Sequence, residues 1–253
     1  MDRQENLKNI IMYLMADNRV NHQIPSSLEG RQRMMRALMN VWEPKAISEE
    51  FLKMQDAELQ MQREDKGVVE ISDITPQTSD IRLWQGDITR LKVDAIVNAA
   101  NAQALGCWAP LHNCIDNCIH SAAGIQLRKE CADKMQGLLL ATGDAFITQG
   151  YNLPAKHVIH TVGPIIPDGI PTKEQEEQLA QCYRSCLDLA EENGLESIAF
   201  CCISTGVFHF PNQRAAEIAI ETVRSYPRHA LKTIVFNVLL DKDRNIYQQL
   251  LRA

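Results

Sequence analysis

The stretch that decides the fold covers residues 93–101 and reads Val-Asp-Ala-Ile-Val-Asn-Ala-Ala-Asn. Its apolar run is short and rich in β-branched residues, which predicts a strand buried on both faces of a sheet. Asn98 and Asn101 stand where that strand ends, and the alanines between them leave room for a bound molecule. Because amide side chains both donate and accept hydrogen bonds, we expect both residues to contact a polyhydroxyl ligand.

Strands and helices alternate beyond this stretch. We expect strands at residues 81–84, 144–148, 157–161, 198–203 and 233–240. We expect helices at residues 113–123, 125–135, 173–193 and 212–225, and from about residue 244 to the end, with Gly194 as a left-handed cap. This order predicts an α/β fold with a largely parallel or mixed sheet covered on both faces. Ligands in such folds bind beyond the carboxyl ends of the strands, so the chemistry should lie in the loops there.

The N-terminal quarter of the chain is different, because it is rich in methionine, nearly free of glycine and patterned for helices. Ser26 with Glu29 resembles a capping box for a second helix, and Ser48 can cap a third. The expected units are a helical N-terminal extension at residues 1–66, a linker at 67–80 and a second domain at 81–253. The extension could recruit a partner, cover the sheet or mediate self-association. Its apolar stripes should pack on the second domain rather than on a foreign helix.

Composition excludes several classes of protein. The chain has 253 residues and a net charge of -6, which argues against a nucleic-acid binder because such a protein needs a basic surface. A hydrophobic content of 45% is enough for a sizeable core. No apolar run is long enough to span a membrane, and the first residues do not resemble a secretory signal. We therefore expect a cytoplasmic protein.

Two further loops follow expected strands. Residues 85–89 read Gln-Gly-Asp-Ile-Thr, where Asp87 could accept a hydrogen bond from an exocyclic amine. A turn followed by a helix cap is the alternative interpretation. Residues 202–208 read Cys-Ile-Ser-Thr-Gly-Val-Phe, a turn of small residues before a helix. Such a turn exposes backbone N–H groups that can hold a diphosphate, although an ordinary strand–helix turn would look the same.

Taken in this order, these motifs resemble the macrodomain family. Two more segments match it: residues 119–124, Ile-His-Ser-Ala-Ala-Gly, and residues 150–164, Gly-Tyr-Asn-Leu-Pro-Ala-Lys-His-Val-Ile-His-Thr-Val-Gly-Pro. The resemblance covers roughly residues 80–253 and implies a three-layer α/β/α fold with a central mixed sheet that binds ADP-ribose. The branch that it suggests hydrolyses mono-ADP-ribose from proteins.

The resemblance also implies which residues meet each part of ADP-ribose. Asp87 would hydrogen-bond the adenine amine, with Ile88 beside it. The diphosphate would be surrounded by the backbone of Ser204, Thr205, Gly206, Val207 and Phe208.

The distal ribose would meet a third group of residues. Asn101 would contact that ribose, and Phe210 would pack near it. Asp116 would lie close to the scissile bond, so Asp116 and Asn101 are the expected catalytic residues.

A metal-binding motif stands where relatives without metal carry a run of glycines. Residues 106–114 read Gly-Cys-Trp-Ala-Pro-Leu-His-Asn-Cys, and Cys107, His112 and Cys114 are the expected ligands of a zinc ion. Three protein ligands leave the fourth position open, as in catalytic zinc sites. Cys118, one helical turn after Cys114, is the alternative ligand. The segment resembles the zinc-containing macrodomains found beside a sirtuin-type transferase and lipoylation proteins in microbes, which also carry a helical N-terminal extension.

The expected function is a zinc-dependent hydrolase that releases mono-ADP-ribose from a modified protein, most naturally from an ester on Asp or Glu. Zinc could bind the attacking water, or it could orient the distal ribose while Asp116 polarises the water. The alternative function is a non-catalytic ADP-ribose-binding module, and oxidation of the thiolates could act as a switch on either. The expected partners are ADP-ribose and a mono-ADP-ribosylated protein, for which the resemblance suggests a lipoyl-carrier protein.

Overall fold

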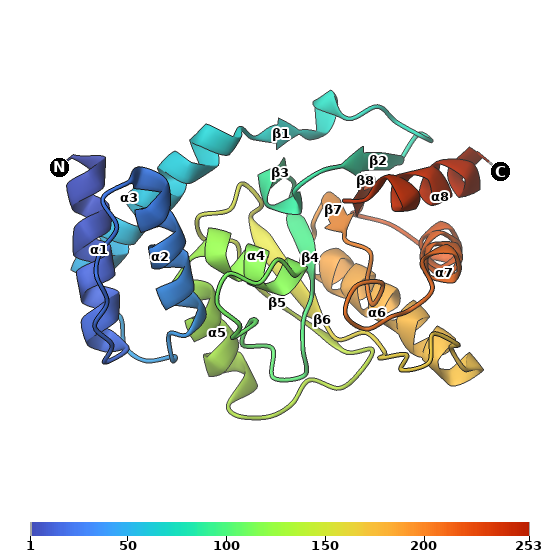
Figure 1. Cartoon of the computed structure of the whole chain (residues 1–253). Coiled ribbons are helices and arrows are strands. Elements are labelled where there is room, and N and C mark those ends of the chain that lie inside the picture. The colour runs from blue at the N-terminus through green and yellow to red at the C-terminus, as the bar shows by residue number, and fades with distance from the viewer. Residues whose placement is uncertain (1, 253) are drawn as a thin grey trace.

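The computed structural model describes residues 2–252 and is built around a six-stranded sheet in the order β2-β8-β7-β4-β6-β5 (Figure 1). The strands are β2 (Ile81–Gln85), β4 (Ala95–Ala99), β5 (Ala145–Gln149), β6 (His157–Thr161), β7 (Ser197–Phe200) and β8 (Thr233–Val238). All neighbouring pairs are parallel except β5 and β6, so the sheet is mixed. Strand β4, the stretch that decided the fold, lies inside the sheet, and its Ile96 and Val97 are fully buried.

Five helices of the second domain cover the sheet. They are α4 (Ile115–Ala123), α5 (Ile125–Met135), α6 (Lys173–Glu192), α7 (Asn212–Ser225) and α8 (Asp241–Arg252). Helix α4 packs on β4, α5 and α6 both pack on β5, and α8 packs on β2 and β8. Helices therefore lie on both faces, which confirms the three-layer α/β/α fold (Figure 1). Within residues 2–252, no helix is both long and apolar enough to cross a membrane.

The N-terminal helices form a bundle at one end of the molecule (Figure 1). They are α1 (Arg3–Asp17), α2 (Leu28–Asn40) and α3 (Glu49–Lys66). Their buried apolar side chains make a hydrophobic core of their own, which also takes in Ile125 of α5. The apolar stripes thus pack on each other and on the second domain, as expected.

Several element ends differ from expectation by one to three residues, and two of these differences have a clear local cause. The cap of α2 is Ser27 rather than Ser26, because the Gly30 N–H donates to Ser27 Oγ at 3.1 Å. Strand β7 ends at Phe200, three residues early, and Ser204 in the following loop has a left-handed φ of 64° that no strand tolerates. Ser48 caps α3 and Gly194 is left-handed, both as predicted.

The segment expected as a linker contains secondary structure. Strand β1 (Val69–Glu70) pairs with β3 (Leu91–Lys92), and a single 3-10 turn follows at Ile71–Asp73. Residues 67–80 are therefore attached to the edge of the second domain rather than free of it.

Candidate functional site

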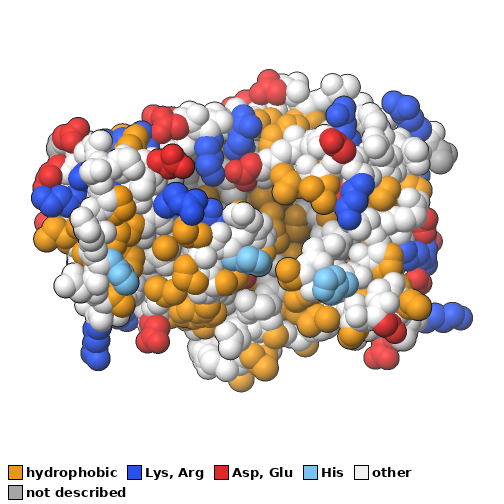
Figure 2. All heavy atoms as spheres, viewed as in Figure 1, with side chains coloured by type: hydrophobic (Ala, Val, Ile, Leu, Met, Phe, Trp, Pro, Cys, Tyr) orange, Lys and Arg blue, Asp and Glu red, His pale blue; other side chains and the backbone are white. Residues whose placement is uncertain are grey.

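The candidate residues lie beyond the carboxyl ends of the parallel strands β2, β4 and β7. Figure 2 shows a hollow lined mainly by hydrophobic side chains near the middle of the face that is turned to the viewer. The loops that follow β4 and β7 lie on this face, and β4 and β7 are neighbours in the sheet (Figure 1).

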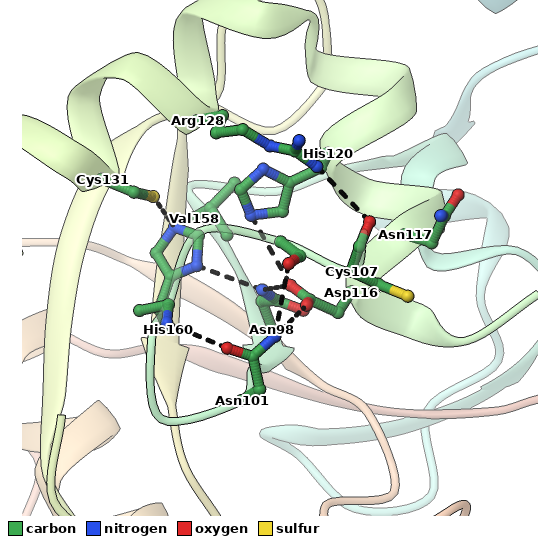
Figure 3. Close-up of polar contacts among 12 residues, drawn as sticks. Asn98, Asn101, Cys107, Asp116, Asn117, His120, Arg128, Cys131, Val158 and His160 are labelled. Carbon is green, nitrogen blue, oxygen red and sulfur yellow. Dashed lines mark hydrogen bonds and ion pairs between the residues drawn. The ribbon is translucent and has the colours of Figure 1, made fainter. Parts of the chain in front are cut away.

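Asp116 lies in the first turn of α4, where the helix dipole favours a carboxylate. It is only 4% exposed. Asn98 Nδ2 donates to its Oδ1 at 2.8 Å, and Asn101 Nδ2 lies 3.4 Å from its Oδ2 (Figure 3). Burial raises the pKa of Asp116 to about 6, although the Asn98 hydrogen bond and the Arg128 charge oppose that shift. A carboxyl with such a pKa can take up or release a proton near neutral pH.

Asn98 differs from expectation, because it is fully buried and does not face the cleft. Its Nδ2 lies between Asp116 and His160, whose Nδ1 is 3.1 Å away and which is its partner in the register of β4 and β6 (Figure 3). His160 Nδ1 must accept this bond, so Nε2 carries the proton and donates to Thr148 Oγ1 at 3.0 Å. Burial lowers the pKa of His160 to about 3, which keeps the ring neutral. Asn98 is therefore a residue that orients Asp116.

His120 packs beside this group. Its Nε2 lies 3.5 Å from Asp116 Oδ1, and burial lowers its pKa well below the usual 6.5. Donor atoms of His120, Cys131 and His160 lie within 4.8 Å of one another, but both ring nitrogens of His160 are already in hydrogen bonds. We therefore assign no metal to that cluster.

The three expected metal ligands come together. The donor atoms of Cys107, His112 and Cys114 lie within 4.8 Å of one another, and Cys107 Sγ is 3.6 Å from His112 Nδ1. Ligands at zinc bond lengths of about 2.0–2.3 Å in a tetrahedron lie roughly 3.5 Å apart, so this spacing suits one ion. Burial raises the pKa of Cys114 to about 12, and the neighbouring Cys107 adds to that shift. A nearby cation is then needed to form the thiolate, and the donor set fits zinc.

Cys118, the alternative ligand, lies outside this group of three. Its Sγ is 3.8 Å from Nη2 of Arg36, on the side of α4 that faces the N-terminal bundle.

Asp87 acts both as a cap and as an ion-pair partner. Its Oδ1 accepts from the Thr89 N–H at 3.0 Å, and its Oδ2 lies 3.3 Å from Lys66 Nζ. Burial alone would raise the pKa of Asp87, but Thr89 and Lys66 outweigh that effect and lower it. Ile88 is 1% exposed, so only its backbone can reach a ligand.

The loop at residues 201–211 presents unused donors. Within residues 2–252, no group accepts a hydrogen bond from the backbone N–H of Gly206, Val207 or Phe208. Ser204 Oγ is buried and also has no partner among those residues. The loop closes on itself through the Phe210 N–H, which donates to the Ser204 carbonyl at 3.0 Å, and Thr205 lies within it.

Phe210 itself is 1% exposed and belongs to the hydrophobic core. Its packing near the distal ribose therefore stays a prediction, in which only the small exposed part of its ring could be reached by a ligand.

Sequence reasoning missed four residues that shape the site. His160 lies in the quoted segment 150–164, where its position opposite a polar strand residue could have drawn attention to it. Arg36, Asn40 and Lys66 belong to the N-terminal helices, and no local pattern connects them with a site far along the chain.

The arrangement of strands, loops and donors agrees with known proteins. The Macro domain family matches residues 97–219. A protein-ADP-ribose hydrolase of Treponema medium is 49% identical over 261 residues, covering 99% of this chain and 100% of that protein. A protein-ADP-ribose hydrolase of Staphylococcus aureus (strain MRSA252) is 50% identical over 232 residues, covering 89% of this chain and 86% of that protein. The structure of the Trypanosoma brucei macrodomain in complex with ADP-ribose has a TM-score of 0.67 at 32% identity, covering 85% of this chain and 94% of that one. The chain therefore belongs to the macrodomain family.

Proposed function

We propose that this macrodomain is a zinc-dependent hydrolase that releases mono-ADP-ribose from an ester on an Asp or Glu side chain of a protein. The observation that carries the proposal is the position of Asp116, a buried carboxyl with a raised pKa two residues after the ligand Cys114. The hydrolase activity itself is supported by full-length relatives at 49% identity that are named protein-ADP-ribose hydrolase.

Binding of ADP-ribose would use groups that the fold leaves open. Asp87 would accept from the adenine amine, in competition with Lys66. The unused N–H groups of residues 206–208 would hold the diphosphate, since backbone donors can bind an anion without a positive side chain. Asn101, which is half-buried and in reach of Asp116, would contact the distal ribose.

Catalysis would depend on how Asp116 is held. Asn98 and Asn101 fix the carboxylate, so that it can orient a water molecule toward the anomeric carbon and accept a proton from it. A zinc ion on Cys107, His112 and Cys114 would supply an open coordination position for an oxygen atom, either of water or of a ribose hydroxyl.

A module that only binds ADP-ribose is the competing function. Binding would not require a carboxyl that is almost completely buried and held by two amides, because burying a charge is costly. The environment of Asp116 therefore favours the enzyme.

One incubation tests the proposal. The purified protein would be mixed with a substrate mono-ADP-ribosylated on Asp or Glu, with and without a chelator, while bound metal is measured. The substrates would include an ADP-ribosylated lipoyl-carrier protein, the partner that the family resemblance suggests. We expect release of ADP-ribose that stops when the metal is removed. We expect Asp116→Asn to lower kcat about 100-fold or more, because it removes the proton acceptor.

The control is Asp133→Asn, which changes an exposed carboxylate on α5 and should leave kcat unchanged. Retention of the label by metal-loaded protein would refute the hydrolase. Release that survives complete removal of metal would refute the zinc dependence alone.

A further inference from the structure

We infer that helix α2 of the N-terminal bundle positions the proposed metal site. Its Arg36 and Asn40 hold residues 107–114 in the conformation that brings the three expected ligands together. This inference rests on the proposed metal site and assigns these two residues a positioning role.

Arg36 and Asn40 lie four residues apart, on one face of α2. Nη2 of Arg36 donates to the backbone carbonyl of His112 at 2.7 Å. Oδ1 of Asn40 accepts from the backbone N–H of Leu111 at 2.9 Å. The two side chains therefore hold the backbone at the ligand His112 and at the residue just before it.

The guanidinium of Arg36 has a second acceptor that ties it to α4. Its Nη2 donates to Asn117 Oδ1 at 2.8 Å, and its Nε lies 3.3 Å from the same oxygen. Asn117 is fully buried, and its Nδ2 donates to the carbonyl of Ala109 at 2.9 Å. Arg36 thus holds the loop directly at His112 and indirectly, through Asn117, at Ala109.

The other end of the loop is joined to the same helix. Nη1 of Arg128 donates to the carbonyl of Asn40 at 2.7 Å, and its Nη2 lies 3.4 Å from the carbonyl of Cys107. The guanidinium also lies 4.1 Å from the centre of the Trp108 ring. Backbone groups near Cys107 and at His112 are therefore both linked to the end of α2.

The loop needs this support because it has no secondary structure of its own. No helix or strand covers residues 107–114 in the described chain, and one backbone hydrogen bond, from the His112 N–H to the Ala109 carbonyl at 3.2 Å, lies within it. Side chains therefore supply much of the support for its backbone. Leu111 has a φ of 60°, which costs energy for a residue other than glycine and persists only when the surroundings enforce it. His112 is exposed, so packing alone does not fix it.

The test is a Co²⁺ titration of the full-length, metal-free protein, following the visible absorption of thiolate-bound cobalt. We expect Arg36→Ala to bind Co²⁺ about tenfold more weakly or worse, the size of effect seen when a partner of a metal ligand is removed. Electrostatics alone predicts the opposite, because loss of a positive charge near the site should strengthen cation binding. Arg36→Lys keeps the charge but loses the planar guanidinium that donates from both Nε and Nη2, so it should also weaken binding.

The matched control is Arg33→Ala, one turn earlier on α2. Arg33 is exposed and makes no hydrogen bond or ion pair with any residue from 2 to 252, so Co²⁺ affinity should not fall. Unchanged affinity in Arg36→Ala, with wild-type protein binding Co²⁺ normally, would overturn the inference and leave the proposed function intact. Failure of wild-type protein to bind Co²⁺ or Zn²⁺ would overturn the metal site and the inference together.

A second measurement on the wild-type protein covers the case in which Arg36→Ala does not fold. Hydrogen exchange should be slow at the Leu111 amide, which donates to buried Asn40, even before metal is added. Exchange as fast as at an unprotected loop amide such as Gly206 would overturn the inference.

Discussion

Asp116 owes its properties to neutral side chains that lie behind it. Asn98 donates to it, His160 fixes Asn98, and Thr148 fixes the tautomer of His160. None of these partners carries a charge, since burial lowers the pKa of His160 to about 3. The carboxyl is thus oriented by neutral groups, and burial outweighs the Asn98 hydrogen bond and the Arg128 charge that lower its pKa.

The buried His160 should make the protein sensitive to acid. Its pKa is about 3 in the folded chain against 6.5 ordinarily, so below pH 6.5 only the unfolded chain takes up the proton. The stabilisation that results from the low pKa of folded His160 is fully present above pH 6.5 and is lost as the pH falls toward 3. Between pH 6.5 and pH 5 the loss should be about 2 kcal/mol. Urea unfolding at pH 7.5, 6.5 and 5.0 measures it, for the wild type and for His160→Gln.

The comparison with His160→Gln isolates this histidine. His120, also held neutral by burial, acts in the same direction, and Asp116 acts oppositely between about pH 4 and pH 6, but both remain in the variant. His160→Gln should be less stable at pH 7.5 and should lose less stability on acidification. Parallel pH curves for the two proteins would contradict the prediction.

At this scale, the sequence predicted what spacing and chemistry can reveal. The expected ligands Cys107, His112 and Cys114 form a local pattern, and their donor atoms do lie together. Asn98 was predicted to contact ADP-ribose because a strand pattern does not show which side chains are buried within the sheet. Arg36 was not predictable, because its partners are 76 and 81 residues away along the chain.

Among the elements, the conformation of the loop between β7 and α7 depends on the close approach of Gly163, which follows β6. A Cβ on Gly163 would lie 2.0 Å from Ser204 Oγ and 2.9 Å from Ile203 Cγ2. Gly163→Ala should therefore displace the donors at residues 206–208. We expect ADP-ribose affinity to fall about tenfold, or about 1.4 kcal/mol, as measured by calorimetry.

The control for this prediction is Gly194→Ala at the end of α6. It introduces the same methyl group at a left-handed glycine with no atom within 4 Å, so it should reduce stability but not affinity. Equal affinity in the two variants would show that the approach of Gly163 does not set the loop.

The element boundaries show where pattern reasoning loses accuracy. Residues 125–135, 157–161 and 212–225 were predicted to the residue, because the apolar pattern and the flanking Gly or Pro agree. Strand β7 was predicted too long, since apolar Cys201 and Ile203 are buried in a loop rather than in a strand.

At the scale of the whole molecule, the two hydrophobic cores are joined by buried polar contacts. Arg128 of α5 donates to the carbonyls of Asn40 and Trp42 at 2.7 and 3.0 Å. Gln55 of α3 is fully buried and accepts from the Ile125 N–H at 3.0 Å. We expect the N-terminal bundle and the second domain to unfold together.

Arg128→Met tests this junction. It leaves the carbonyls of Asn40, Trp42 and Cys107 without this donor, which should cost at least about 2 kcal/mol and lower Tm by roughly 4–8 °C. Thermal unfolding followed by helix signal and by tryptophan fluorescence measures it, since Trp42 is buried in the N-terminal core. Lys129→Met is the control, because Lys129 pairs on the surface with Asp133 and such pairs contribute little. A Tm for Arg128→Met equal to that of the control would contradict the prediction.

The three-layer fold was predictable from the sequence because alternating strands and helices allow few arrangements. The place of the N-terminal bundle beside α4 and α5 was not, because its apolar stripes show that it packs but not where. Polar contacts across the junction, such as those made by Arg36, Asn40 and Gln55, specify that docking position.

The hydrogen bonds from α2 to the backbone of Leu111 and His112 also affect whether the proposed metal site can be transferred to another protein. The conformation of residues 107–114 depends on side chains of α2. Grafting these residues onto a macrodomain that lacks the N-terminal helices would therefore transfer the donor atoms without the hydrogen bonds that position them. Asn40 and Leu111 are 71 residues apart in sequence, yet they must be inherited as a pair. If the proposed metal site is present, chimeras joined anywhere between them should bind Co²⁺ only when both parents make the same contact.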